Sequence, residues 1–256
     1  MSGLVSMTEN EKKERAQFLS RAAEPLEKIA FIRLFSIIVA ALVLLLTFVM
    51  FIQLMSYSDS TTSYNLMNIF VFLLGIVNII LTIIFMVKLN ELSEYESRFK
   101  TAMIFMIIAI VSDFFSNCVS SPAFAIFLSI ASCILSIVFI YHFYGALADI
   151  TADQNNFLSD RWDLLFKVYI GVSIVAAILS VIGLANSNSW DTIELGYICI
   201  LIAAFLEIIL LIIEFNLLRK TVNFFEELGG DIQPQGRFDD SEYNPQQYFS
   251  NNGKDF

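Results

Sequence analysis

The chain has 256 residues, of which 57 % are hydrophobic, and its mean hydropathy is +0.71. Apolar residues make up only about 45–50 % of a typical soluble domain, so this composition excludes an ordinary soluble protein. The formal net charge of −10 also argues against a nucleic-acid partner, because neutralising phosphates requires a basic surface.

The apolar residues are concentrated in six long runs. Each run is close to the ~20 residues that an α-helix needs to cross the hydrocarbon core of a bilayer. Lipid cannot hydrogen-bond to free backbone amides, so membrane-crossing segments are helices or strands of closed barrels. Barrel strands alternate apolar and polar residues over about ten positions, and these runs are longer and more continuous. We therefore expect an all-α polytopic membrane protein with six transmembrane helices, at residues 32–55, 66–88, 101–121, 122–144, 165–185 and 195–218.

The first predicted element, within residues 1–30, is an amphipathic helix that precedes the spans. Phe18, Leu19 and Ala23 fall on one side of this helix and charged residues on the other. Such a helix typically lies on the membrane surface with its apolar side toward the lipid. Pro25 should end it and begin the helix that leads into the first span, because proline lacks the amide hydrogen that a helix interior requires.

Residues 31–228 then form the membrane domain. Its third and fourth spans are separated only by a tight turn near Pro122. From Gly229 onward the chain is polar and rich in Asn, Gln, Asp and Gly. Such a composition buries too little apolar surface to fold, so residues 229–256 are predicted to be a disordered cytoplasmic tail.

The lysines and arginines indicate how the spans are oriented. Three connections contain none of them, at residues 57–64, 119–121 and 186–192. All 15 lie on the other side of the predicted membrane: Lys12, Lys13, Arg15, Arg21, Lys28, Arg33, Lys88, Arg98, Lys100, Arg161, Lys167, Arg219, Lys220, Arg237 and Lys254. Basic residues accumulate on the cytoplasmic side, so both termini are expected there. We expect a multi-pass protein of the plasma membrane, and the short outer loops and small size favour a bacterial source.

The even-numbered spans resemble one another at their cytoplasmic ends. The matching segments are ILTIIFMVKL at 80–89, ILSIVFIYHF at 134–143 and ILLIIEFNLL at 209–218. Extending the match toward the outer side aligns the small residues Gly75, Ser129 and Ala204, and the polar residues Asn78, Ser132 and Glu207. The match predicts three repeated helical hairpins around a pseudo-threefold axis. The alternative is chance similarity among apolar sequences of limited composition.

Small and polar residues recur at helical spacing in every span. Helices in lipid associate through close packing and hydrogen bonds, so these stripes are first of all packing faces. The longest stripe is in the third span and includes Asp113, Ser116 and Asn117. The functional interpretation is that the most polar stripes line a hydrated path through the bundle.

Asp113 and Glu207 are the two acids predicted nearest the middle of the membrane. Each lies 12 or 13 residues from a basic residue at the inner interface, or roughly 18–20 Å along a helix. A charged side chain at that depth costs about 2.5 kcal/mol or more, so it should face the bundle interior. One hypothesis is a proton- or cation-binding site of Asp113 and Glu207 with Asn78, Ser116 and Asn117 nearby. In the other hypothesis, each acid is neutral and hydrogen-bonded to a neighbouring helix. Glu214 lies two turns closer to the cytoplasm, where it either extends the path or is hydrated at the interface.

The sequence contains no motif that identifies a catalytic, cofactor or metal site. An intramembrane aspartyl protease needs two aspartates in the membrane, and only Asp113 is available. We therefore expect a protein that is not an enzyme and has no cofactor. The first hypothesis is a packing, scaffolding or accessory component that contacts the lipid bilayer and other membrane proteins or copies of itself. The second is a small transporter or channel that uses Asp113 and Glu207.

Overall fold

The computed structural model describes residues 9–55, 61–118, 122–152, 154–186 and 193–230. These residues form seven α-helices: α1 (Glu9–Arg21), α2 (Ala23–Met55), α3 (Thr61–Leu92), α4 (Ser97–Cys118), α5 (Pro122–Ala152), α6 (Asn156–Asn186) and α7 (Ile193–Gly230). The same ranges contain no β-strand. Six of the helices are long and apolar enough to cross a membrane. The predicted all-α class, with six helices able to span a membrane, is therefore confirmed.

The helices are longer than the predicted spans. α7 has 38 residues, or about 57 Å at 1.5 Å per residue, whereas the hydrocarbon core of a bilayer is about 30 Å thick. α5 likewise continues to Ala152, well past residue 144. Helices α5 and α7 are therefore longer than their predicted spans, and the extra turns supply surfaces on which other elements pack.

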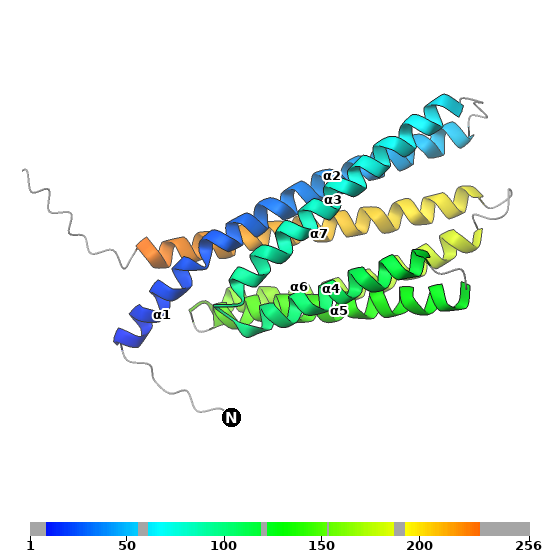
Figure 1. Cartoon of the computed structure of the whole chain (residues 1–256). Coiled ribbons are helices and arrows are strands. Elements are labelled where there is room, and N and C mark those ends of the chain that lie inside the picture. The colour runs from blue at the N-terminus through cyan, green and yellow to red at the C-terminus, as the bar shows by residue number, and fades with distance from the viewer. Residues whose placement is uncertain (1–8, 56–60, 119–121, 153, 187–192, 231–256) are drawn as a thin grey trace, which may run out of the picture.

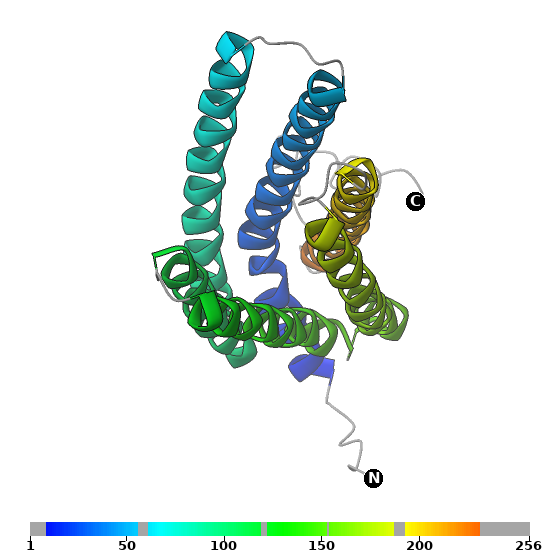
Figure 2. The ribbon, with the colours of Figure 1, turned by 90° about the vertical axis from the view of Figure 1, so that its right-hand side faces the viewer.

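The six long helices follow one another around a ring in chain order. α2 packs against α3 and α7, α6 packs against α5 and α7, and α4 packs extensively against α5. The ring is closed only by a short contact between α3 and α4. Figures 1 and 2 show that the α2–α3 pair diverges from the α4–α5 pair with distance from α1. We call the end of the bundle near α1 the α1 end and the opposite end the far end.

The hydrophobic core lies at the α1 end. Its largest fully buried side chains come from five helices: Phe85, Phe99, Phe143, Tyr144, Trp162 and Phe225. Aromatic contacts link them, with the ring of Phe143 5.7 Å from that of Phe85 and 6.0 Å from that of Phe99. Toward the far end, large apolar side chains are exposed, and Phe72 of α3 is 68 % accessible. The α1 end is thus packed as one core, whereas the far halves have exposed apolar faces.

The predicted N-terminal helix forms as α1, but its apolar face packs on protein. Leu19 and Ala22 are buried, and α1 contacts the extension of α7. The backbones approach closely there, since a Cβ added at Gly229 would lie 3.0 Å from the Cβ of Ser20. The expectation that this face lies against lipid differs from the structure because the α7 extension offers the buried apolar residues Val222 and Phe225 instead.

The predicted effect of the proline is confirmed. α1 ends at Arg21 and α2 begins at Ala23, so Pro25 lies in the first turn of α2. The first turn of a helix tolerates proline because its amide groups have no partner within the helix.

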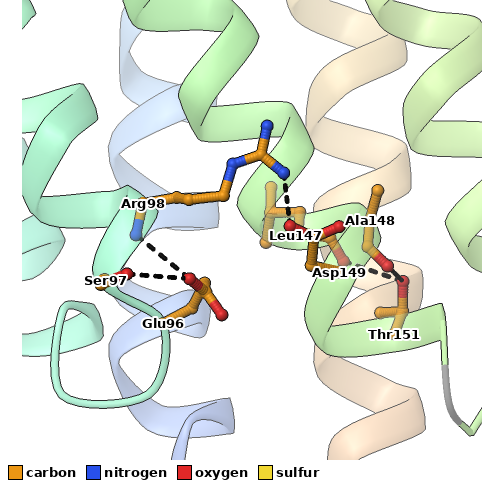
Figure 3. Close-up of polar contacts among 7 residues, drawn as sticks. All are labelled: Glu96, Ser97, Arg98, Leu147, Ala148, Asp149 and Thr151. Carbon is orange, nitrogen blue, oxygen red and sulfur yellow. Dashed lines mark hydrogen bonds and ion pairs between the residues drawn. The ribbon is translucent and has the colours of Figure 1, made fainter. Parts of the chain in front are cut away.

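An arginine ties α4 to α5 at the α1 end, as Figure 3 shows. Glu96 precedes α4 and accepts hydrogen bonds from the Oγ of Ser97 and the backbone N–H of Arg98, both at 3.2 Å. The side chain of Arg98 crosses to α5 and pairs with Asp149. A Cβ at Gly145 would clash with the guanidinium of Arg98, so the arginine crosses α5 where the helix has no side chain.

Candidate functional site

A cavity of about 660 Å³ lies alongside α2, between α3 and α7. Its wall extends along α2 from Arg33 to Thr47, which is roughly 21 Å of helix. Most of its lining is aliphatic. The polar residues on its wall are Arg33, Ser36, Thr47, Asn78, Thr82 and Glu207. We call it the α2–α3–α7 cavity.

A second cavity, of about 330 Å³, adjoins the first, and we call it the central cavity. Five helices contribute to its wall, from α2 and from α4 to α7. Its lining includes Asp113 of α4, the hydroxyl groups of Ser132 and Ser136 of α5, and Glu214 of α7. Ser132 donates a hydrogen bond of 3.1 Å to the backbone carbonyl of Ala109, which links α5 to α4 beside this cavity.

Arg33, Met106 and Leu211 line both cavities. These residues come from α2, α4 and α7 and form the boundary between the two spaces. Arg33 is the charged member of this boundary. Its position along α2 puts it at the α1 end of the larger cavity.

Arg33 forms a buried ion pair with Glu214 of α7. The Nε–H of Arg33 donates to the Oε1 of Glu214 at 2.7 Å, and their side chains are 16 % and 4 % exposed. The hydroxyl group of Tyr144 donates to the Oε2 of Glu214 at 3.0 Å. On its other side, the guanidinium lies 4.5 Å from the ring centroid of Phe85. A buried charge is tolerated only when paired and hydrogen-bonded, and these three contacts satisfy that requirement.

An aromatic contact connects Tyr144 to a second buried hydrogen bond in the core. The ring of Tyr144 lies 5.5 Å from that of Trp162, and the Nε1–H of Trp162 donates to the Oγ1 of Thr221 at 3.1 Å. Tyr144, Trp162 and Thr221 are all essentially inaccessible to solvent. These contacts therefore link α2, α5, α6 and α7 around Glu214.

The predicted site residues are divided between the two cavities. Asn78 and Glu207 line the α2–α3–α7 cavity, while Asp113 lines the central cavity. Ser116 donates a hydrogen bond of 2.7 Å to the backbone carbonyl of Asp113, within its own helix. The side chain of Asn117 lies outside the described residues. The structure thus brings Asn78 and Glu207 to one cavity and puts Asp113 across the boundary in the other.

Sequence reasoning missed the role of Arg33. It counted this residue only as a marker of the cytoplasmic side, and it gave Glu214 no partner. A usable signal was present, since Arg33 lies inside the first predicted span and Glu214 lies inside the last one. Two opposite charges near the same ends of two spans are expected to pair, because neither is stable alone in lipid.

The wall of the α2–α3–α7 cavity carries only a few polar groups that could bind a ligand. Glu207 contributes a carboxylate, Asn78 an amide, and Ser36, Thr47 and Thr82 hydroxyl groups. Ser36 and Thr47 donate to carbonyls of their own helix, at 3.0 and 2.9 Å, so their oxygens remain available as acceptors. Within the described residues, no three His, Cys, Asp or Glu side chains are grouped so as to hold a metal ion. Chemically, this wall suits a proton or a singly charged cation.

Comparison of the chain with protein-family models, with curated proteins and with solved structures finds no match.

Proposed function

We propose that this membrane protein is a small transporter or channel that moves a proton or a cation through the ring of helices. The observation that carries the proposal is the pair of adjoining cavities, each with a carboxylate from a candidate span on its wall. Ionisable residues within spans are costly and usually line pathways or face protein. The cavities favour this hypothesis over the scaffolding one, because packing alone does not require an accessible acid.

In this proposal Glu207 and Asp113 are successive binding positions, one in each cavity. Asn78 assists Glu207, and Ser132 and Ser136 assist Asp113 from the facing helix. The Arg33–Glu214 pair at the boundary separates the two positions. Passage between them requires the boundary residues to move, so conduction is expected to be slow and gated.

The test is a flux assay on the purified chain in proteoliposomes at two pH values. We expect proton or monovalent-cation flux that Glu207→Gln and Asp113→Asn each reduce at least about tenfold, because each removes a charge that binds the ion. The matched control is Glu227→Gln, which makes the same change on α7 outside the lining of both cavities. Absence of flux, or flux that neither cavity variant changes, would eliminate the transport proposal.

A second candidate function is that of a packing or accessory component of a membrane assembly. The observation that favours it is the short contact between α3 and α4, which leaves apolar side chains of α3 such as Phe70, Phe72 and Ile79 at least half exposed. A partner helix would pack there. Cross-linking in membranes from a cysteine at position 72, compared with one at position 174 on α6, tests this candidate. Equal labelling at both positions would contradict it.

We also propose that both termini are cytoplasmic and that the chain resides in the plasma membrane of a bacterium. The one-sided distribution of all 15 basic residues supports the orientation. In a cysteine-free background, Glu227→Cys should react with an impermeant maleimide only after the cells are permeabilised, whereas Ser58→Cys should react in intact cells. The reverse pattern would overturn the orientation.

The three-hairpin repeat remains part of the proposal, and burial at aligned positions supports it. The aligned triplets are all buried at the α1 end: Phe85, Phe139 and Glu214; Leu89, Phe143 and Leu218; Leu92, Ala146 and Thr221. Glu214 is thus the polar member of an otherwise apolar ring of equivalent positions. An experimental structure whose three hairpins do not superpose about a common axis would contradict the repeat.

A further inference from the structure

The α2–α3–α7 cavity combines a long apolar wall with one acidic group near its middle. Asn78 lies seven residues from Val71 and seven from Phe85, and all three line the cavity along α3. Glu207 lies between Ile200 and the boundary residue Leu211 on the opposite wall. The volume of about 660 Å³ is within the range of about 300–1,000 Å³ that is typical of small-molecule sites.

The charges on this wall select the sign of a ligand. Among the described lining residues, Glu207 is the only carboxylate and Arg33 the only cation. The charge of Arg33 is balanced by Glu214, to which its Nε–H donates at 2.7 Å. The accessible carboxylate therefore determines the local field, which attracts a cation and repels an anion.

The shape and chemistry of the wall select the size of that cation. Divalent ions such as Ca²⁺ require about six to eight oxygen ligands, and Mg²⁺ requires an octahedral set. One carboxylate, one amide and a few hydroxyl groups spread along the cavity do not provide such a cage. The aliphatic side chains instead provide a surface that would be buried by an apolar body.

We infer that the α2–α3–α7 cavity binds a hydrophobic monovalent cation, with Glu207 opposite the positive charge and the aliphatic wall around its apolar groups. This inference rests on the proposed cation site and specifies its substrate class. The ligand would be an organic amine or onium ion that partitions into the bilayer. Asn78 would position the charged group from the facing helix α3.

The probe is tetraphenylphosphonium, and its binding is measured by equilibrium dialysis against the full chain in a non-ionic detergent. We expect saturable binding with one site per chain. Glu207→Gln should weaken this binding at least about tenfold, because it removes the carboxylate that pairs with the bound cation. Glu227→Gln makes the same change on α7 outside the lining of both cavities and should leave the binding unchanged.

Two further comparisons test the sign of the charge and the location of the site. Tetraphenylborate has the same shape and the opposite charge, and it should bind much more weakly. A Cβ added at Gly75, on the cavity wall, or at Gly171, outside the described lining, meets no atom within 4 Å. Gly75→Leu should therefore fill the cavity and reduce binding, whereas Gly171→Leu should not. Because Gly75→Leu preserves the charge, it remains informative if Glu207→Gln fails to fold.

Several outcomes would overturn the inference. These are equal affinity for the phosphonium and the borate, unchanged binding by Glu207→Gln, and equal effects of Gly75→Leu and Gly171→Leu. Failure of the proposed function is distinct from these outcomes. If the wild-type chain shows Glu207-dependent proton flux but does not bind the phosphonium, only the proposed substrate class is overturned. If it binds the phosphonium specifically but shows no flux, only the transport proposal is overturned.

Discussion

Arg33 and Glu214 are 181 positions apart in the chain, and their side chains meet at 2.7 Å in the interior of the helix ring. The pair joins the first and the last spans, at the boundary between the two cavities. Each charge depends on the other, because neither group is stable alone in a low-dielectric environment. Loss of either partner alone is therefore expected to destabilise the ring, and the pair is also part of the candidate pathway.

The first prediction concerns this pair. Arg33→Met or Glu214→Leu alone should destabilise the protein by about 3–5 kcal/mol, because each leaves an uncompensated buried charge. The double variant should lose much less stability than the sum of the two single losses, since two apolar side chains of similar volume replace the pair. The measurement is thermal or denaturant unfolding in detergent micelles, followed by circular dichroism.

The double-mutant cycle separates this interpretation from a surface ion pair. A coupling energy below about 1 kcal/mol, which is typical of exposed pairs, would contradict the buried pair. The matched surface control is Lys28 with Glu24, an exposed pair at 2.5 Å within one helix. Removing either partner there should change stability only slightly.

The second prediction concerns Tyr144, which donates to the same carboxylate at 3.0 Å. Tyr144→Phe removes the donor and preserves the ring, so its cost should be that of a buried hydrogen bond to a charged group, about 1.5–3 kcal/mol. Tyr141→Phe is the control, because Tyr141 is on the same helix and its ring is 48 % exposed. Equal stability of the two variants would contradict the contact with Glu214.

The number and type of spans could be predicted from the sequence because each span depends only on the residues within it. A run of about 20 apolar residues forms a helix in lipid wherever it lies in the chain. The start of α2 was predictable for a similar reason, since the effect of Pro25 is local. The ends of the helices could not be predicted in this way. Helix α7, for example, continues to Gly230 as an extension that packs against α1, and this packing depends on the tertiary structure.

The candidate site was predictable only in part, because depth along a helix does not specify rotation about its axis. One of the two hypotheses groups Asp113, Glu207 and Asn78 in a single site. Asn78 and Glu207 do share a cavity, whereas Asp113 lines the other one. The partner of Arg33 could not be predicted for the same reason, since a pair separated by 181 positions depends on how α2 and α7 pack.

The third prediction concerns Gly145, where Arg98 crosses α5. Gly145→Ala should displace the guanidinium from Asp149, but alanine stabilises a helix by about 0.8–1.0 kcal/mol relative to glycine. An exposed ion pair contributes about 0–1 kcal/mol, so the two effects should nearly cancel. In an Asp149→Asn background, Arg98 is already free to move, and Gly145→Ala should then stabilise. Unfolding measurements on the wild type, the two single variants and the double variant test this, and strictly additive effects would contradict the crossing.

The fourth prediction distinguishes packing of α1 on the protein from binding of α1 to lipid. Leu19 is 3 % exposed on the face of α1 that contacts α7, whereas Gln17 is exposed. Leu19→Asp should release α1 in detergent and speed tryptic cleavage after Arg21, because proteases cut chains that open locally. Gln17→Asp adds the same charge and should leave the rate unchanged. If α1 were held by lipid alone, the wild type in detergent would already be cleaved as fast as Leu19→Asp, and the packing of α1 on α7 would be refuted.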